Sequence, residues 1–183
     1  MNRFILTGAP GSGKTAILRQ LEIEGFSVVE EAATDVIAIE QARGVVEPWK
    51  DARFIDSITE LQRRRQILKS FEAGDIQFHD RSVVCTAALA IYLGYRIPET
   101  LRQEIERIRS ESVFDRHVFF IQNLGFVTPS AARRISLEEA LRFEQIHFEV
   151  YESFGFEIVS IKQATVEERV AMIRGTVEAA ARC

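Results

Sequence analysis

Residues 8–15 read Gly-Ala-Pro-Gly-Ser-Gly-Lys-Thr, and this stretch decides the fold. It fits the phosphate-loop pattern G-x-x-x-x-G-K-[ST] at every fixed position. Glycines let the backbone curl so that successive N–H groups point at one phosphate cluster, at the positive end of the following helix. The residues expected to bind a nucleotide are therefore Gly8, Ala9, Pro10, Gly11, Ser12, Gly13, Lys14 and Thr15.

The residues on either side of this loop fit the same interpretation. Residues 3–7 form a short apolar run suited to a buried strand, and residues 16–21 have apolar positions suited to a helix packed on a sheet. Within the loop, Lys14 is expected to reach the β- and γ-phosphates, and the Thr15 hydroxyl is expected to bind Mg²⁺. The sequence thus predicts a nucleotide-binding protein.

The composition sets the class of protein. A chain of 183 residues suits one domain, residues 1–183, with a single substantial core. The net charge of −4 argues against a nucleic-acid partner. Two cysteines are too few for a disulfide scaffold, and Cys85 is expected in the core. Without a signal peptide or an apolar run long enough to span a membrane, we expect a cytoplasmic protein.

Strand and helix signals alternate along the chain. The strand candidates are short and rich in Val, Ile or Phe, and each is followed by a helical segment; they are residues 3–7, 26–30, 76–80, 117–122 and 156–161. This order predicts an α/β fold with a parallel sheet covered by helices on both faces. The loop between Leu124 and Ser136 carries Gly125, Pro129 and two arginines, and it is the best candidate for a mobile segment.

Four features mark the expected helices. A stripe formed by Phe54, Ile58, Leu61, Leu68 and Phe71 predicts a helix over residues 51–73. Its Arg63-Arg64-Arg65 run is interpreted as a solvated helix face, with contact to an anionic ligand as the alternative. Pro98 is placed at the start of another helix. Ser136 with Glu139, and Thr165 with Glu168, have the spacing of a capping box and predict two more helix starts.

Polar residues gather where the strands end, which is where open α/β sheets bind ligands. Glu30 and Glu31 end the second strand candidate, and only one can point into the site because neighbouring strand residues face opposite ways. Glu31 is favoured as the group that accepts a proton from an attacking hydroxyl or orients a water. Asp80 can hold Mg²⁺ or cap the next helix, and Arg81 can contact a phosphate or the acceptor, or form a plain salt bridge.

Other residues have weaker signals. Arg133 and Arg134 lie in the loop after the fourth strand, where an arginine of a closing lid can stabilise a transferring phosphoryl group; an ordinary surface loop is the alternative. Trp49 can stack on a substrate ring or pack under a loop. The spacing of His117 and His147 does not indicate a metal site.

Together these motifs resemble the nucleoside and nucleotide kinases. Residues 28–33, Val-Val-Glu-Glu-Ala-Ala, and 78–82, Phe-His-Asp-Arg-Ser, are most similar to small predicted ATPases that resemble the nicotinamide riboside kinase domain. The resemblance implies a P-loop NTPase fold in three α/β/α layers, with a five-stranded parallel sheet of order 2-3-1-4-5. It also implies an acceptor-side region at about residues 42–58, a lid at about residues 125–136, and ATP with Mg²⁺ as cofactors.

Two functions follow as hypotheses. The first is an ATP- and Mg²⁺-dependent kinase with a small nucleoside-like acceptor, and its predicted catalytic residues are Lys14, Glu31, Asp80, Arg81, Arg133 and Arg134. The second is a regulator that hydrolyses ATP or GTP slowly and has no small-molecule acceptor. ATP is preferred because residues 122–125 read Gln-Asn-Leu-Gly rather than the Asn-Lys-x-Asp of regulatory GTPases. A monomer or dimer is preferred over a ring because the third strand ends in Asp80-Arg81 rather than a paired Asp-Glu.

Overall fold

A computed structural model describes residues 1–71, 74–124 and 136–180 of the chain. The five strands form one parallel sheet and are β1 (Asn2–Thr7), β2 (Ser27–Val29), β3 (Ile76–Asp80), β4 (His117–Ile121) and β5 (Glu157–Ile161). Their order across the sheet is β2-β3-β1-β4-β5, which confirms the order implied by the resemblance. Each strand lies within one residue of its predicted bounds at either end.

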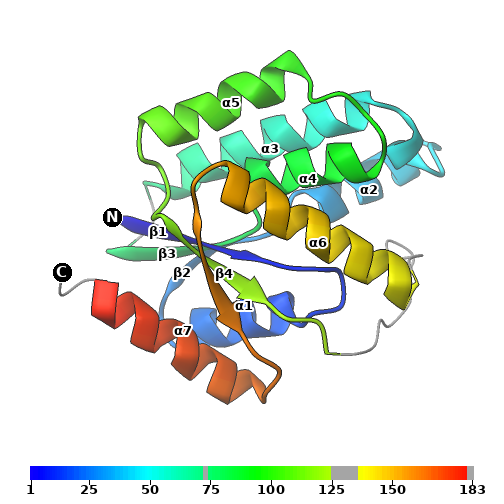
Figure 1. The fold of residues 1–183 in the computed structure, drawn as a ribbon. Helices are drawn as coiled ribbons and strands as arrows, with labels where there is room; N and C mark the ends of the chain where they lie inside the picture. Colours follow the sequence, from blue (N-terminus) through cyan, green and yellow to red (C-terminus); the bar gives the residue numbers. More distant parts are fainter. Residues whose placement is uncertain (72–73, 125–135, 181–183) are drawn as a thin grey trace.

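The helices cover both faces of the sheet, as expected (Figure 1). They are α1 (Lys14–Ile23), α2 (Ala33–Ala42), α3 (Arg53–Lys69), α4 (Val83–Tyr92), α5 (Glu99–Ser110), α6 (Leu137–Ser153) and α7 (Val166–Ala180), with a short 3₁₀ helix η1 (Pro48–Lys50). The α1 and α7 helices lie together on one face, and α3, α4, α5 and α6 lie on the other. The fold is therefore the three-layer α/β/α arrangement of a P-loop NTPase.

Alternation along the central strand divides the core between the two faces. Phe4 and Leu6 of β1 pack with α1 and α7, whereas Ile5 between them packs with α4 and its neighbours. All three side chains are buried. This alternation fixes the register of β1, because a slip by one residue would exchange the two faces.

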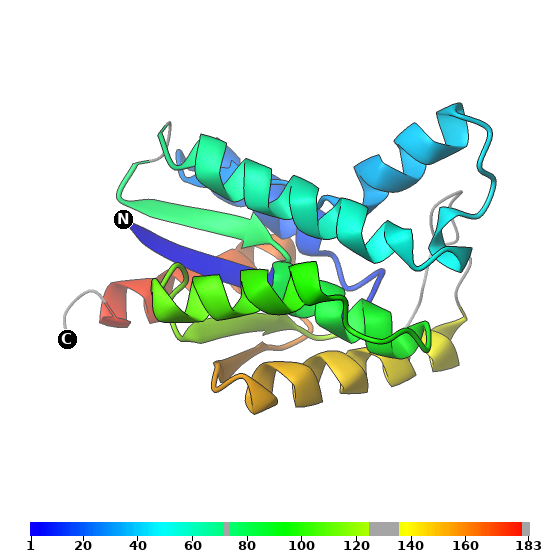
Figure 2. The same ribbon diagram turned by 90° about the horizontal axis from the view of Figure 1, so that it is seen from above.

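The carboxyl ends of the central strands form the edge on which the site is built. Leu6 of β1 pairs with Asp80 of β3, and Thr7 pairs with Phe120 of β4, so these three strands end almost level. Seen from above, α2 and η1 extend past the sheet on the side toward which the strand arrows point (Figure 2). Loops that are distant in sequence therefore meet at one edge.

The described helices confirm most of the predicted boundaries. Ser136 and Glu139 form a complete capping box at the start of α6, and Thr165 and Glu168 exchange the same pair of hydrogen bonds before α7. Pro98 lies at the N-cap of α5, directly before its first helical residue. Cys85 is buried in the core, as predicted.

The prediction for the helix over residues 51–73 is wrong at its C-terminal end. The α3 helix ends at Lys69, and the side chains of Leu68 and Phe71 are 53% and 85% exposed. The buried face instead runs through Gln66, whose amide oxygen accepts a hydrogen bond from Arg107 of α5. Leu68 is two residues further along and lies on the opposite side of the helix from this buried face.

Candidate active site

The phosphate loop connects β1 to α1, as the sequence predicts. Gly8 has a φ of +129°, and a side chain there would lie 2.4 Å from the carbonyl oxygen of Ile121. This close approach to β4 allows only glycine, since a Cβ atom cannot come so near a backbone oxygen. Pro10, Gly11 and Thr15 line a cavity, while Ala9 and Ser12 of the same loop are buried.

Lys14, the first residue of α1, lies folded over its own loop. Its amino group donates hydrogen bonds to the carbonyl oxygens of Gly8 and Ala9, at 3.0 and 2.8 Å, and to the Ser12 hydroxyl at 3.1 Å. Burial and the nearby Arg81 guanidinium lower the pKa of Lys14 to about 7, although Asp80 and Glu31 act in the opposite direction. The Lys14 amino group therefore lies against the loop, and it loses its proton as the pH rises through about 7.

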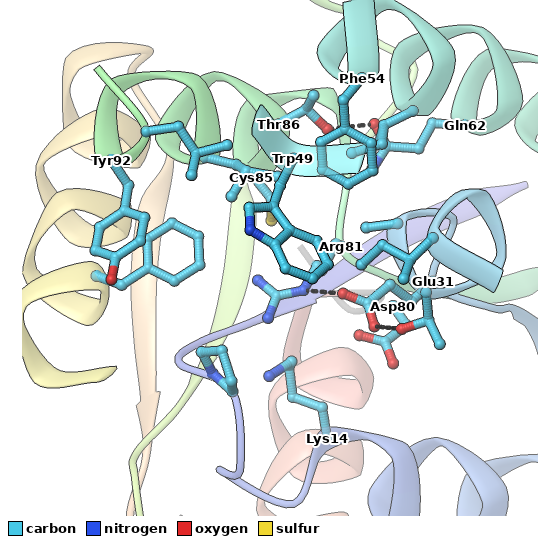
Figure 3. Close-up of a pocket in the computed structure, with 18 of the residues that line it drawn as sticks. Lys14, Glu31, Trp49, Phe54, Gln62, Asp80, Arg81, Cys85, Thr86 and Tyr92 are labelled. Carbon is cyan, nitrogen blue, oxygen red and sulfur yellow. Dashed lines mark hydrogen bonds and ion pairs between the residues drawn. The ribbon is translucent and has the colours of Figure 1, made fainter. Parts of the chain in front are cut away.

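The two glutamates after β2 point in different directions. Glu31 lines the cavity, where its carboxylate accepts a hydrogen bond from Arg81 Nε at 2.7 Å and another from the Thr34 hydroxyl at 2.9 Å (Figure 3). Glu30 is exposed and pairs with Arg19 of α1. Burial opposes ionisation of Glu31, but Arg81 and Lys14 outweigh it and lower its pKa. Glu31 is thus the acidic side chain that faces the site.

Arg65 of α3 fixes the backbone that carries Glu31. Its guanidinium donates to the Glu31 carbonyl oxygen at 2.6 Å and pairs with Asp35 of α2. The interpretation of residues 63–65 as a solvated face is therefore wrong for Arg65, which is half-buried, whereas Arg63 and Arg64 are exposed. Arg65 reaches inward because α3 runs directly beside the turn that follows β2.

Asp80 and Arg81 stand at the end of β3. Asp80 is buried and lines the cavity, and Ser82 rather than Asp80 caps α4 by accepting a hydrogen bond from the Val84 N–H at 3.2 Å. Arg81 has a φ of +71°, and its N–H donates to the Leu6 carbonyl oxygen at 3.0 Å. A positive φ in a residue other than glycine is strained, and here it turns the guanidinium into the cavity.

A histidine that sequence reasoning missed completes the surroundings of Arg81. His147 of α6 is buried, and its Nδ1–H donates to the Phe143 carbonyl oxygen at 2.8 Å. Its Nε2 is then free to accept a hydrogen bond from Arg81 Nη1, 2.9 Å away. Burial, followed by the charge of Arg81, lowers the pKa of His147 well below its usual range. Glu31 and His147 thus hold Arg81 from two sides.

The cavity beside the phosphate loop has a volume of about 510 Å³. Its apolar and aromatic walls come from four helices and η1, and include Ile37, Trp49, Phe54, Ile58, Leu89, Tyr92, Leu93 and Phe143. Gln62 and Thr86 add polar groups to the same wall, joined by a 2.7 Å hydrogen bond from the Thr86 hydroxyl to the Gln62 amide oxygen (Figure 3). That bond leaves the Gln62 amide nitrogen as a donor for a ligand.

The structure brings together most of the predicted catalytic residues. Lys14, Glu31, Asp80 and Arg81 all line this cavity, and so does Thr15, which was predicted to bind the nucleotide and Mg²⁺. Arg133 and Arg134 lie outside the described residues, as does the predicted lid except for Ser136. No signal in the sequence links His147 to Arg81, since 66 residues separate them.

The donors at the loop suit Mg²⁺. Magnesium is usually held by one or two carboxylates and by substrate phosphates, with oxygen ligands throughout. Thr15 offers a hydroxyl and Asp80 a carboxylate, and both face the same cavity. Among residues 1–71, 74–124 and 136–180, no cluster of three or more His, Cys, Asp or Glu side chains could hold a metal by itself. A magnesium ion here would take its other ligands from the nucleotide and from water.

The sheet order and the loop between β1 and α1 define a P-loop nucleotide-binding domain. The AAA domain family matches residues 3–169, and the chain belongs to this family. The protein is accordingly a P-loop enzyme of the kinase or ATPase kind. No curated protein sequence matches the chain significantly. None of the described helices is long and apolar enough to cross a membrane.

A solved structure shares the whole fold. The deoxyadenosine kinase of M. mycoides, in a structure with the products dCMP and dCDP bound, superimposes with a TM-score of 0.58. The match covers 97% of this chain and 98% of the kinase, at 14% sequence identity. At that identity the likeness establishes a common fold.

Proposed function

We propose that the protein is an ATP- and Mg²⁺-dependent kinase that phosphorylates a hydroxyl group of a small nucleoside-like acceptor. The observation that carries this proposal is the cavity of about 510 Å³ beside the phosphate loop. Glu31 and Arg81 line this cavity together with residues of the loop. Hydrolysis requires space for only one water molecule. A cavity of this size with aromatic walls and a few polar groups is typical of a site for a small organic ligand.

The charged groups of the site suit phosphoryl transfer. Lys14 would turn from its loop carbonyls to the β- and γ-phosphates, while Thr15 and Asp80 would hold Mg²⁺, which neutralises charge on the phosphates. Glu31 would accept the proton of the attacking hydroxyl. The hydroxyl oxygen would bond to the γ-phosphorus as the bond between the γ-phosphorus and the ADP oxygen breaks. Arg81 would bind the acceptor or the transferring group. Arg133 and Arg134 stay candidates for lid arginines.

The shape of the cavity supports a nucleoside-like acceptor. A planar ring could lie among Trp49, Phe54 and Tyr92, and the donor on Gln62 could hydrogen-bond to an acceptor atom on its edge. The deoxyadenosine kinase with the same fold carries nucleotide products in its structure, which adds support. Such an enzyme would act in the cytoplasm, where ATP and Mg²⁺ are available, as a monomer or dimer.

Direct detection of the product tests the proposal. Purified protein, ATP and Mg²⁺ would be mixed with a panel of nucleosides, nicotinamide riboside and nucleoside monophosphates, and products identified by mass spectrometry. We expect one class of acceptor to gain a phosphoryl group with wild-type protein and none to do so with Lys14→Ala. Formation of ADP with no phosphorylated acceptor would overturn the kinase proposal.

Membership of the AAA domain family favours a second candidate, a regulatory ATPase or GTPase that acts without a small-molecule acceptor. In that case Glu31 would orient a water, and the cavity would be occupied by a segment of a protein partner. A hydrolysis rate that depends on such a partner, and not on any nucleoside, would distinguish this candidate from the kinase.

A further inference from the structure

A buried arginine lies behind the phosphate loop. Arg169 belongs to the first turn of α7 and is only 2% exposed. Within the described part of the chain, no carboxylate forms an ion pair with it, and burial lowers its pKa. Burial of a cation is costly, and a positive charge near a helix N-terminus is also unfavourable. The hydrogen bonds of Arg169 must offset both costs.

Three backbone carbonyl oxygens surround the Arg169 guanidinium. Nη1 donates to Ser12 in the phosphate loop at 2.7 Å, Nη2 donates to Gln122 at 2.7 Å, and Nε donates to Lys162 at 3.0 Å. Gln122 directly follows β4, and Lys162 directly follows β5. One side chain therefore joins the phosphate loop to the ends of two neighbouring strands.

The bond to Ser12 has a consequence for the next peptide group. The Ser12 carbonyl and the Gly13 N–H belong to one planar trans peptide, so they point in opposite directions. Because the carbonyl points at Arg169, the Gly13 N–H points away from it, on the side of the loop that faces the cavity. Gly13 lines that cavity, and no hydrogen bond within the described residues occupies its N–H.

We propose that Arg169 is a positioning residue for nucleotide binding, which holds the Ser12–Gly13 peptide so that the Gly13 N–H is directed at a phosphate. The inference rests on the nucleotide binding assumed in the proposed function, but not on the identity of the acceptor. Close packing supports it, because a Cβ atom on Gly13 would lie 3.1 Å from Arg169 Nη1. A charge-assisted bond to the carbonyl also polarises the peptide and makes its N–H a better donor.

The test measures ADP binding by calorimetry in wild type, Arg169→Met, Arg169→Lys and the control Ile173→Ala. Ile173 is buried one turn further along α7, so its truncation weakens the same helix without touching the three carbonyls. Arg169→Met should raise the Kd for ADP about tenfold or more, as expected for loss of a charge-assisted hydrogen bond. Arg169→Lys should recover part of the affinity, and Ile173→Ala should stay within about twofold of wild type despite a lower Tm.

The amide NMR signal of Gly13 provides a second readout that does not depend on stability. We expect ADP to shift this signal strongly in wild type and much less in Arg169→Lys. If Arg169→Met does not fold, the shift measured in Arg169→Lys tests the role of Arg169. The proposal would be overturned if Arg169→Met bound ADP with wild-type affinity, or if Ile173→Ala lost as much affinity as Arg169→Met. It would also be overturned if ADP shifted the Gly13 signal as strongly in Arg169→Lys as in wild type. A wild type that binds ADP but phosphorylates no acceptor would instead refute the kinase function and leave the role of Arg169 intact.

Discussion

The phosphate side of the site and the cavity proposed to bind the acceptor, called the acceptor side below, are built in different ways. The phosphate side is one continuous loop, residues 8–15, whose backbone and Lys14 supply its polar groups. The acceptor side is a cavity with walls that come from α2, η1, α3, α4 and α6, and side chains form nearly all of it. Backbone groups bind any phosphate, whereas side-chain walls select one shape. Changes on the phosphate side should therefore affect every reaction, and changes on the acceptor side should affect only the choice of acceptor.

The largest expected effect is that of Lys14→Ala. Removal of the cation proposed to neutralise the β- and γ-phosphates should lower nucleotide turnover about 10³-fold with every acceptor tested. Circular dichroism and Tm should show an intact fold. Lys69→Ala, which removes an exposed lysine at the end of α3, is the control and should keep full activity. Turnover by Lys14→Ala at the wild-type rate would remove the phosphate loop from the mechanism.

Glu31 lies where the phosphate side meets the acceptor side. The Glu31→Gln variant should lower kcat about 100-fold, since the amide cannot accept the hydroxyl proton. Its KM for ATP should change little. Glu30→Gln is a matched control, because the neighbouring carboxylate is exposed and pairs with Arg19 instead. Steady-state kinetics of both variants would check the assignment. Equal losses in the two variants would contradict it.

Arg81→Gly should separate the acceptor side from the phosphate side. Glycine accepts the positive φ of this position, so the variant removes the guanidinium without adding backbone strain. We expect kcat/KM for the acceptor to fall about 30-fold while the Kd for ATP changes less than about threefold. Arg63→Ala, on the exposed face of α3, serves as the control. Equal losses for acceptor and ATP would show that Arg81 serves the phosphate side instead.

The smallest expected effect is a pH dependence confined to the phosphate side. Because the pKa of Lys14 is lowered to about 7, the free protein loses this proton as pH rises above 7, whereas phosphate binds the protonated amine. Affinity for ADP should thus be highest below pH 7 and fall about fivefold from pH 7 to pH 8. Lys14→Arg stays charged throughout and reports the titration of ADP itself. Calorimetry should show no such decline in that variant, and a parallel decline in both would contradict the assignment to Lys14.

The sequence predicts a side of the site well when the residues that form it are neighbours along the chain, and poorly when they are distant. The phosphate loop is contiguous, and its strand and helix follow from neighbouring residues, so its place in the fold was predictable. The alternation expected at the end of the second strand was enough to separate Glu30 from Glu31. Glu31 was favoured only slightly, and the structure shows that it is the one that lines the cavity. From the sequence, Asp80 could either hold Mg²⁺ or cap the next helix. The structure excludes the second role, because Ser82 is the N-cap residue of α4.

The acceptor side was less predictable because long-range packing creates it. Phe54 and Ile58 were expected on a buried stripe, yet nothing local indicated that they would meet Tyr92 and Phe143 around one cavity. The contact between Arg81 and His147 joins β3 to α6 and leaves no pattern in the sequence. Arg169 was likewise missed, since an arginine after a capping box is ordinarily a surface residue.

The left-handed backbone at Arg81 has an evolutionary consequence. Most substitutions there would keep the strain and lose the contacts, so they would be selected against on both counts. Glycine is different, because it relieves the strain while it removes the group expected to meet the acceptor. Arg81→Gly is therefore expected to keep the nucleotide-binding domain folded while it weakens use of the proposed acceptor. Enzyme and regulatory descendants of one ancestor could diverge at this step.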